Sequence, residues 1–168
     1  RMVAVTAPDG GETAYTYDAL GNLIGETDAL GNATAFAYTA ESLLEMVTYA
    51  NGATQSLTYD LAGNVTAETD AEGNTKQYQY DKVNRLTAVI DEAGSKTSYA
   101  YDALDNIAKV TDALGHVTSY TYDKNGNLTS ETNALGNKVQ YAYTPEGWLE
   151  SITKAAVSYT HLRAHETK

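Results

Sequence analysis

The stretch Tyr59-Asp60-Leu61-Ala62-Gly63-Asn64-Val65 decides the fold, because its pattern returns along the chain at intervals of 21 residues. A strict period of this length, without insertions, is typical of repeat proteins, in which one small supersecondary unit is stacked many times. The repeat is therefore the unit that has to fold. The seven corresponding tyrosines are Tyr17, Tyr38, Tyr59, Tyr80, Tyr101, Tyr122 and Tyr143.

Three further columns of the repeat carry one kind of residue each. A β-branched residue stands ten positions after the tyrosine in every copy, for example Thr27 and Ile90. β-Branched residues favour strands, and glycine favours turns that need positive φ. The aliphatic column, six after the tyrosine, is Leu23, Leu44, Val65, Leu86, Ile107, Leu128 and Leu149. The glycine column, four after the β-branched residue, is Gly31, Gly52, Gly73, Gly94, Gly115 and Gly136.

Each repeat is predicted to be an antiparallel β-hairpin. In one copy, a strand over 97–102 carries the Tyr-x-Tyr element, a turn over 103–106 reverses it, and a second strand covers 107–112. Asp, Gly and Asn in the turns fit this interpretation, since Gly and Asn tolerate positive φ and Asp bonds its own backbone two residues on. A helix is disfavoured by the spacing of the apolar columns. We expect an all-β fold, an array of 21-residue hairpins forming a curved sheet.

The two faces of this sheet should differ. Tyr15, Phe36 and Leu57 lie two residues before a repeat tyrosine, so they share its face. A single hairpin is marginal in water, so each repeat must pair with its neighbours, about 9.5 Å away along the sheet. Small or polar residues on the opposite face suit a wetted surface: Thr16, Ala37, Thr58, Gln79, Ala100, Thr121 and Ala142.

Composition and charge exclude several functions. The chain has 14 Tyr and 13 Gly but no Cys, so disulfides and thiolate sites are excluded. Its formal net charge of −11 argues against nucleic acid and against anionic lipid. No apolar run is long enough to span a membrane.

Catalytic and metal sites are not predicted. Asp18, Asp60 and Asp102 recur at one place in the repeat, as turn formers do, whereas a catalytic pair needs two different environments. His116 occupies a turn column that holds Asn elsewhere, and we expect a solvated turn residue. His161 and His165 have an i, i+4 spacing but lack a third ligand. We therefore predict no enzyme activity, no catalytic residue, no cofactor and no metal.

The ends of the chain suggest a fragment. Thr6 and Gly10 already stand in phase with the repeat, and residue 1 is not Met, so we expect residues 1–155 to be a piece of a longer array of about seven repeats. Residues 156–167 resemble the in-frame translation of a transposon-end sequencing adapter, so 156–168 are expected to be an artefactual, disordered tail. Trp148 is expected to pack over its turn.

Binding functions remain as alternatives. Acidic turns at regular spacing suggest calcium binding, but the nonapeptide period of calcium β-rolls is absent. Exposed tyrosines could stack on carbohydrate at a cell surface, although such repeats are usually rich in Trp and this chain has one. A β-repeat scaffold without cargo is the third alternative.

The repeat Tyr-x-Tyr-Asp-x-x-Gly-Asn-Leu, followed by Thr-Asp-Ala-Leu-Gly-Asn, resembles the YD repeat of the Rhs family, which is related to toxin-complex C components and to teneurins. The resemblance covers about residues 3–155. It implies a hollow shell of β-hairpins in a secreted or surface-exposed bacterial protein. In Rhs polymorphic toxins the shell encloses a variable C-terminal toxin, so the implied partners are the rest of the shell and a toxin cargo that this stretch lacks.

Overall fold

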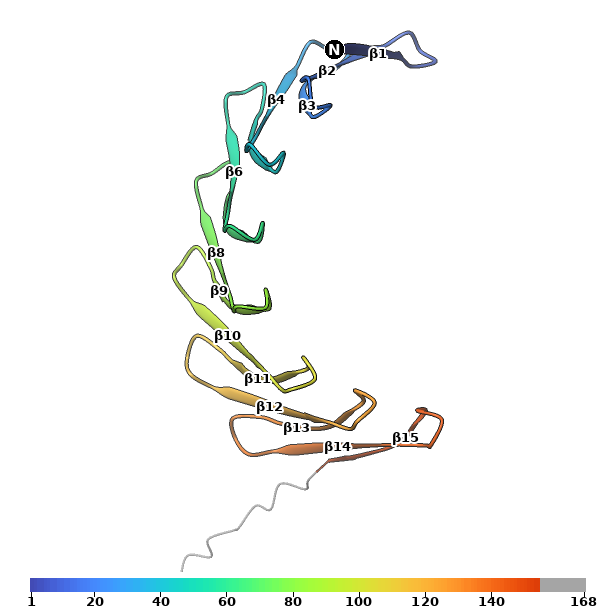
Figure 1. Cartoon of the computed structure of the whole chain (residues 1–168), viewed down its shortest axis with the longest axis vertical. Helices are drawn as coiled ribbons and strands as arrows, with labels where there is room; N and C mark the ends of the chain where they lie inside the picture. The colour runs from blue at the N-terminus through green and yellow to red at the C-terminus, as the bar shows by residue number, and fades with distance from the viewer. Residues whose placement is uncertain (155–168) are drawn as a thin grey trace, which may run out of the picture. The chain divides into compact units, whose positions relative to one another are not determined.

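The structure, a computed structural model, describes residues 1–154, and all of its regular elements are strands (Figure 1). Residues 155–168, with the expected tail and the His161 and His165 pair, lie outside the described residues. The fifteen strands are β1 (Met2–Thr6), β2 (Glu12–Tyr17), β3 (Leu23–Thr27), β4 (Ala33–Tyr38), β5 (Leu44–Thr48), β6 (Thr54–Tyr59), β7 (Val65–Thr69), β8 (Thr75–Tyr80), β9 (Leu86–Ile90), β10 (Lys96–Tyr101), β11 (Ile107–Thr111), β12 (Val117–Tyr122), β13 (Leu128–Thr132), β14 (Lys138–Tyr143) and β15 (Leu149–Lys154).

Two compact units divide the chain at residues 96 and 97. In the first unit β1 to β9 pair in chain order, and in the second β10 to β15 do the same, always antiparallel with the next strand. We call the even-numbered strands Tyr strands, because each ends at a repeat tyrosine, and the odd-numbered strands Thr strands. The predicted all-β array of antiparallel hairpins is confirmed.

A β-bulge interrupts every pairing of a Tyr strand with the Thr strand that follows it. In the first copy Thr16 lies opposite Gly25, but Tyr17 lies opposite Leu23, which leaves Ile24 as the extra residue. A bulge bends its strand and increases the local twist. Figure 1 accordingly shows the hairpin ends curling at the turns that follow the Tyr strands. The same register shift occurs at Ala37/Tyr38, Thr58/Tyr59, Gln79/Tyr80, Ala100/Tyr101, Thr121/Tyr122 and Ala142/Tyr143.

Two sets of turns join the strands, and the two sets share the same backbone hydrogen-bonding pattern. We call the turns after Tyr strands Tyr turns and those after Thr strands Thr turns. In the Tyr turn 60–64, Gly63 N–H donates to Asp60 C=O at 3.1 Å and Asp60 N–H donates to Asn64 C=O at 3.0 Å. The Thr turn 70–74 repeats both bonds. Gly63 has φ 85° and Gly73 has φ 86°, a left-handed conformation that favours glycine in a three-residue hairpin loop.

The turn carboxylates accept hydrogen bonds inside their own loops. Asp60 Oδ1 accepts the backbone N–H groups of Ala62 and Asn64, both at 2.9 Å, and Asp60 Oδ2 accepts Asn64 Nδ2 at 3.0 Å. The first contact was predicted from the chemistry of Asp, while the side-chain bond to Asn was not. These hydrogen bonds stabilise the ionised carboxylate, so they hold the pKa of Asp60 below its ordinary value of 3.8.

Burial is slight, because the sheets are single layers. Within residues 1–154, only Ala88 and Ser130 are buried, at 1% and 4% exposure. Large apolar side chains stand exposed at turn tips, for example Leu30 and Leu61. The expectation that Trp148 packs over its turn is wrong, since its side chain is 74% exposed and no neighbouring layer covers it.

The glycine column gives a stability test. We expect Gly73→Ala to destabilise the chain by about 1 kcal/mol, because an L residue at this positive φ is strained although the space around it is open. Gly25→Ala is the matched control. It lies in strand β3 at ordinary φ, with the nearest atom 3.7 Å from its added Cβ, and should be neutral or slightly stabilising. Equal losses of stability for the two variants in urea unfolding would contradict the role of positive φ at Gly73.

The turn carboxylates predict acid sensitivity. Because the folded-state pKa of Asp60 and of Asp70 is lowered, their contribution to stability is present above the ordinary value of 3.8 and is lost as pH falls through the folded-state pKa. We expect Asp60→Asn with Asp70→Asn to be less stable than the parent chain at neutral pH, and the difference in urea midpoint to shrink below about pH 4. A difference that stays constant on acidification would refute this role.

Candidate functional surface: the tyrosine face

The repeat tyrosines and the aliphatic column lie side by side on one face of the sheet, which we call the Tyr face. Tyr17 pairs with Leu23 directly across the bulge, and Tyr59 pairs with Val65 in the same way. All seven tyrosines are half-buried. The aliphatic column is half-buried too, except for Leu149 in β15, which is exposed. The glycine column lies in the Thr turns at φ between 80° and 86°.

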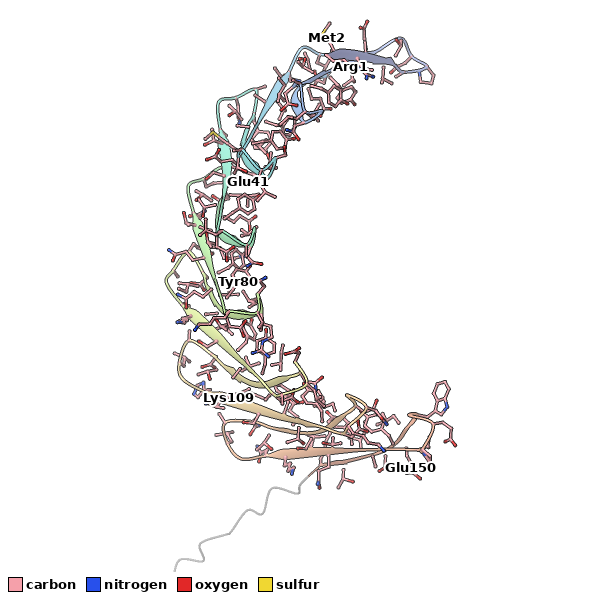
Figure 2. The ribbon with its side chains drawn as sticks, viewed as in Figure 1. Arg1, Met2, Glu41, Tyr80, Lys109 and Glu150 are labelled. Atoms are coloured by element: carbon pink, nitrogen blue, oxygen red, sulfur yellow. The ribbon has the colours of Figure 1, made fainter. Side chains whose placement is uncertain are left out.

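The opposite face is polar, with small side chains. Its column of small or polar residues in the Tyr strands is exposed throughout, as expected for a wetted surface. Hydroxyls pair across it: Thr121 Oγ1 lies 2.9 Å from Thr129 Oγ1 and 2.8 Å from Ser130 Oγ. The two buried residues, Ala88 and Ser130, also lie here, opposite Gln79 and Thr121. Figure 2 shows side chains on both sides of the ribbon.

Tyr59 and Tyr122 also connect neighbouring repeats through their hydroxyls. Tyr59 O–H donates to the backbone carbonyl of Leu44 at 2.6 Å, and Tyr122 O–H donates to the carbonyl of Ile107 at 2.9 Å. Each acceptor belongs to the aliphatic column of the preceding repeat. Leu44 lies beyond Met46, the last paired residue in the β5–β6 ladder. The hydroxyl thus provides a donor for a backbone carbonyl where the strands separate.

Acidic side chains also lie on the Tyr face, since Glu26 pairs with Tyr15, Glu131 pairs with Tyr120 and Glu68 pairs with Leu57. Tyr78 O–H donates to Glu68 Oε2 at 3.1 Å, and Glu68 also lies opposite Lys76 across β7 and β8. Burial raises the pKa of Tyr78 above 10.0, and the hydrogen bond to the Glu68 carboxylate raises it further. Tyr78 therefore stays protonated and acts as a hydrogen-bond donor at physiological pH.

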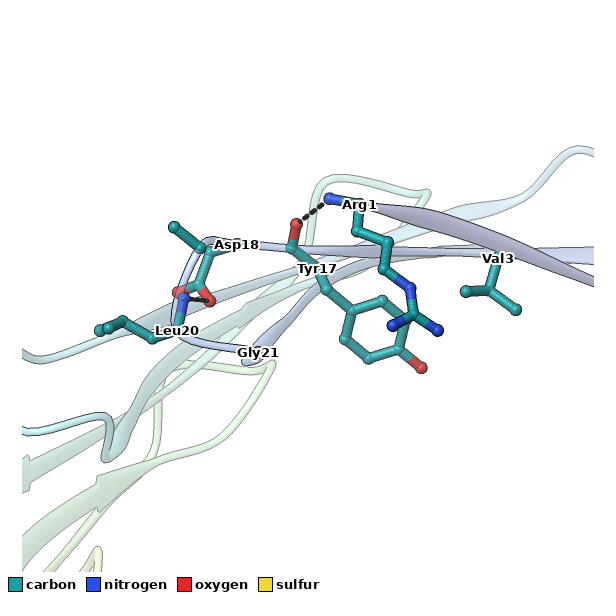
Figure 3. A pocket seen from close by; sticks show the side chains of 7 residues that line it. Arg1, Val3, Tyr17, Asp18, Leu20 and Gly21 are labelled. Atoms are coloured by element: carbon teal, nitrogen blue, oxygen red, sulfur yellow. Dashed lines mark hydrogen bonds between the residues drawn. The ribbon is translucent and has the colours of Figure 1, made fainter.

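Open grooves recur between a Thr strand and the Tyr turn of the next repeat. One, of about 830 Å³, is lined by Arg1, Val3 and residues 17–21, and Figure 3 shows the side chains of Arg1 and Tyr17 next to each other, with the amino group of Arg1 donating to the Tyr17 carbonyl at 2.7 Å. Another, of about 550 Å³, is lined by Leu43, Glu45 and residues 57–63, which are the equivalent positions two repeats later. Repeat geometry accounts for both grooves.

The histidine among the described residues, His116, lies in a turn. His116 Nδ1 lies 2.9 Å from Asp112 Oδ2 in an exposed Thr turn, so it is a solvated turn residue as predicted. Residues 1–154 contain no group of three His, Cys, Asp or Glu side chains placed to hold a metal ion. Nor does any helix in that range have the length and apolarity to cross a membrane.

Removing a bridging hydroxyl should weaken the contact between repeats. We expect Tyr59→Phe to destabilise the chain by about 1 kcal/mol, because the Leu44 carbonyl loses its donor while the ring stays in place. Tyr38→Phe is the control, since its hydroxyl makes no hydrogen bond to a described residue. Urea unfolding followed by circular dichroism compares them; equal effects of the two substitutions would show that the hydroxyl contact contributes nothing.

Comparison with solved structures supports the fold. A Photorhabdus luminescens Tc holotoxin pore with a mutation in TccC3 aligns with a TM-score of 0.68 at 23% identity, over 89% of this chain and 9% of that one. The TcdB2–TccC3–Cdc42 complex gives 0.68 at 22% identity, over 92% and 10%. TcdB2–TccC3 gives 0.67 at 23%, over 90% and 10%. This chain thus spans about a tenth of those chains.

Sequence comparison shows the family. No curated protein sequence matches the chain. The sequence profile of the RHS Repeat matches in overlapping copies that run from one end of the described strands to the other, at residues 1–33, 17–54, 43–75, 59–96, 80–117, 101–138 and 122–156. With its 21-residue hairpins and this continuous match, the chain belongs to the RHS repeat family.

Proposed function

We propose that this chain is a structural module that forms part of the wall of an RHS-type shell. The shell would enclose a C-terminal toxin cargo encoded beyond this chain. The observation that carries the proposal is the single-layer sheet. Within residues 1–154 two small residues are buried, so the sheet has a face on each side and no interior of its own. A layer of this kind separates two spaces, which is what a shell wall does.

The two faces support different surroundings. The columns of tyrosines and aliphatic residues on the Tyr face are half-buried, Leu149 excepted, and burying them further would be favourable. The Tyr-strand column of the other face is threonine, alanine and glutamine and is exposed to water, although Ala88 and Ser130 on the same face are buried. The proposed partners are therefore the rest of the same shell and its cargo, in a secreted or surface-exposed protein. Tyrosine, leucine and glycine columns would hold the wall together.

Similarity to the Tc structures supports a wall rather than an enzyme. The matched part is about a tenth of those chains, so cargo and targeting functions would belong to other parts of a longer protein. The chain would then be non-enzymatic, with residues 1–155 as array and 156–168 as a tail without a role. The competing function is carbohydrate binding through exposed aromatic rings.

Protease protection tests the enclosing role. The native gene, extended past codon 155, would be expressed whole and the protein treated with trypsin. Mass spectrometry would then measure how fast its C-terminal region is cleaved. We expect that region to be cleaved only as fast as the shell opens, and Tyr59→Ala to accelerate cleavage by weakening the wall. Thr58→Ala, the adjacent residue on the wetted face, is the matched control.

Two outcomes would contradict the proposal. One is a C-terminal region digested as quickly in the whole protein as when expressed alone. The other is binding on a glycan array that Tyr59→Ala removes and Thr58→Ala retains, which would support the carbohydrate function instead.

A further inference from the structure

Among residues 1–154, residues other than glycine adopt positive φ at one column of the repeat only. This column is the fourth position of the Tyr turns, where Ser42 has φ 63°, Asn84 has φ 64° and Asp105 has φ 64°. The fourth position of the Thr turns has the same backbone bonds and the same need for positive φ. It is glycine in every copy: Gly10, Gly31, Gly52, Gly73, Gly94, Gly115 and Gly136.

The surroundings of the two columns differ. A Cβ built on any of the Thr-turn glycines of this column meets nothing within 4 Å. A Cβ on Gly63, in a Tyr turn, would lie 3.8 Å from Leu43 Cδ1, and one on Gly126 would lie 3.8 Å from Asn106 Oδ1. Leu43 and Asn106 are the fifth residues of the preceding Tyr turns. At these two positions the fifth residue of one Tyr turn therefore faces the fourth residue of the next, whereas a Cβ on Gly147, in the last Tyr turn, meets nothing within 4 Å.

Hydrogen bonds form at this contact where the fourth residue is polar. Asn22 Nδ2 donates to Ser42 Oγ at 3.1 Å, and Asn64 Nδ2 donates to Asn84 Oδ1 at 3.0 Å. The same amide nitrogens also donate to Asp18 and Asp60 in their own turns. An amide nitrogen carries two N–H groups, so one serves the turn and the other reaches the next repeat.

We propose that the Tyr turns of the first unit form a recognition ladder, in which the fifth residue of one turn selects the fourth residue of the next: Asn22 with Ser42, Leu43 with Gly63, and Asn64 with Asn84. Amide donors face Ser42 and Asn84, whose side chains accept, while Leu43 faces Gly63, which leaves room for it. The bond offsets the backbone strain of a non-glycine residue at positive φ. The Thr turns offer no such neighbour and keep glycine. This inference does not depend on the shell function.

Specific pairs would keep the repeats in order. Chains of similar hairpins are prone to pair with the wrong repeat or with another copy. A wrong neighbour could place Leu43 against polar Asn84, which would then lack the amide donor that Asn64 supplies. Discrimination is the difference in contact free energy between the right pair and a wrong pair. Using different pairs in successive repeats increases that difference.

A double-mutant cycle tests the pairing. Asn64→Leu, Asn84→Gly and the double variant, which reproduces the Leu43–Gly63 pair, would be compared by urea unfolding of the whole chain. If the two sites were independent, the effects of the single substitutions on the unfolding equilibrium constant would multiply. We expect the double variant to be more stable than that product, by roughly two- to tenfold in the unfolding equilibrium constant. If Asn64→Leu alone does not fold, recovery of the β-sheet signal in the double variant supports the ladder.

The control is Asn74, which makes the same bond to its turn aspartate, Asp70 Oδ2 at 2.9 Å, but in a Thr turn. Asn74→Leu combined with Asn84→Gly should show independent, multiplicative effects. Coupling as large at Asn74 as at Asn64 would overturn the proposal. The proposal would also be overturned if the double variant at 64 and 84 were no more stable, and no better folded, than expected from multiplying the two single effects.

Discussion

A sheet one layer thick has no interior, and this constraint governs the rest of the structure. Each hairpin is too small to be stable alone, so it depends on the strands on either side of it. Backbone ladders supply the regular part of that support. Side chains supply the rest at the places where the ladders end, as Tyr59 does for the Leu44 carbonyl.

The β-bulge connects these features. Between β5 and β6 the ladder has three paired positions, whereas β4 and β5 have four with the register shift included. At the bulged end the strands bend and neighbouring Tyr turns come close enough for Asn22 to bond Ser42. The other end has no bulge, and within residues 1–154 its turns pack, as Gly11 does near Ala29, without a hydrogen bond from one Thr turn to the next. One extra residue per repeat thus separates an end where side-chain hydrogen bonds join repeats from an end without them.

Much of this fold could be predicted from the sequence, because a strict period repeats every local signal. The strands expected over 97–102 and 107–112 are found at Lys96–Tyr101 and Ile107–Thr111, and the glycine column lies at positive φ. These features depend on residues close in the chain. The turn role of Asp60 was predicted for the same reason, from its own backbone.

The features that the sequence did not reveal depend on residues of neighbouring repeats. The bulge follows from pairing register, which a single strand does not encode. The hydroxyl contact of Tyr59 reaches fifteen residues back, and the amide contact of Asn64 reaches twenty residues forward. One signal was present: Ser42 and Asn84 break the glycine pattern, and both follow an Asn twenty residues earlier. Trp148 was expected to pack over its own turn, but it is 74% exposed.

Distances between equivalent positions of successive repeats test the stacked single layer most directly. The chain has no Cys, so spin labels can be attached at Ala37→Cys and Gln79→Cys, two exposed positions of one column in the first unit. Four strand spacings separate them, so we expect a narrow distribution near 19 Å between the labelled backbone sites, about 4.8 Å per strand. A broad distribution, or a mean distance unrelated to the strand spacing, would show that the repeats do not stack as neighbours in one sheet.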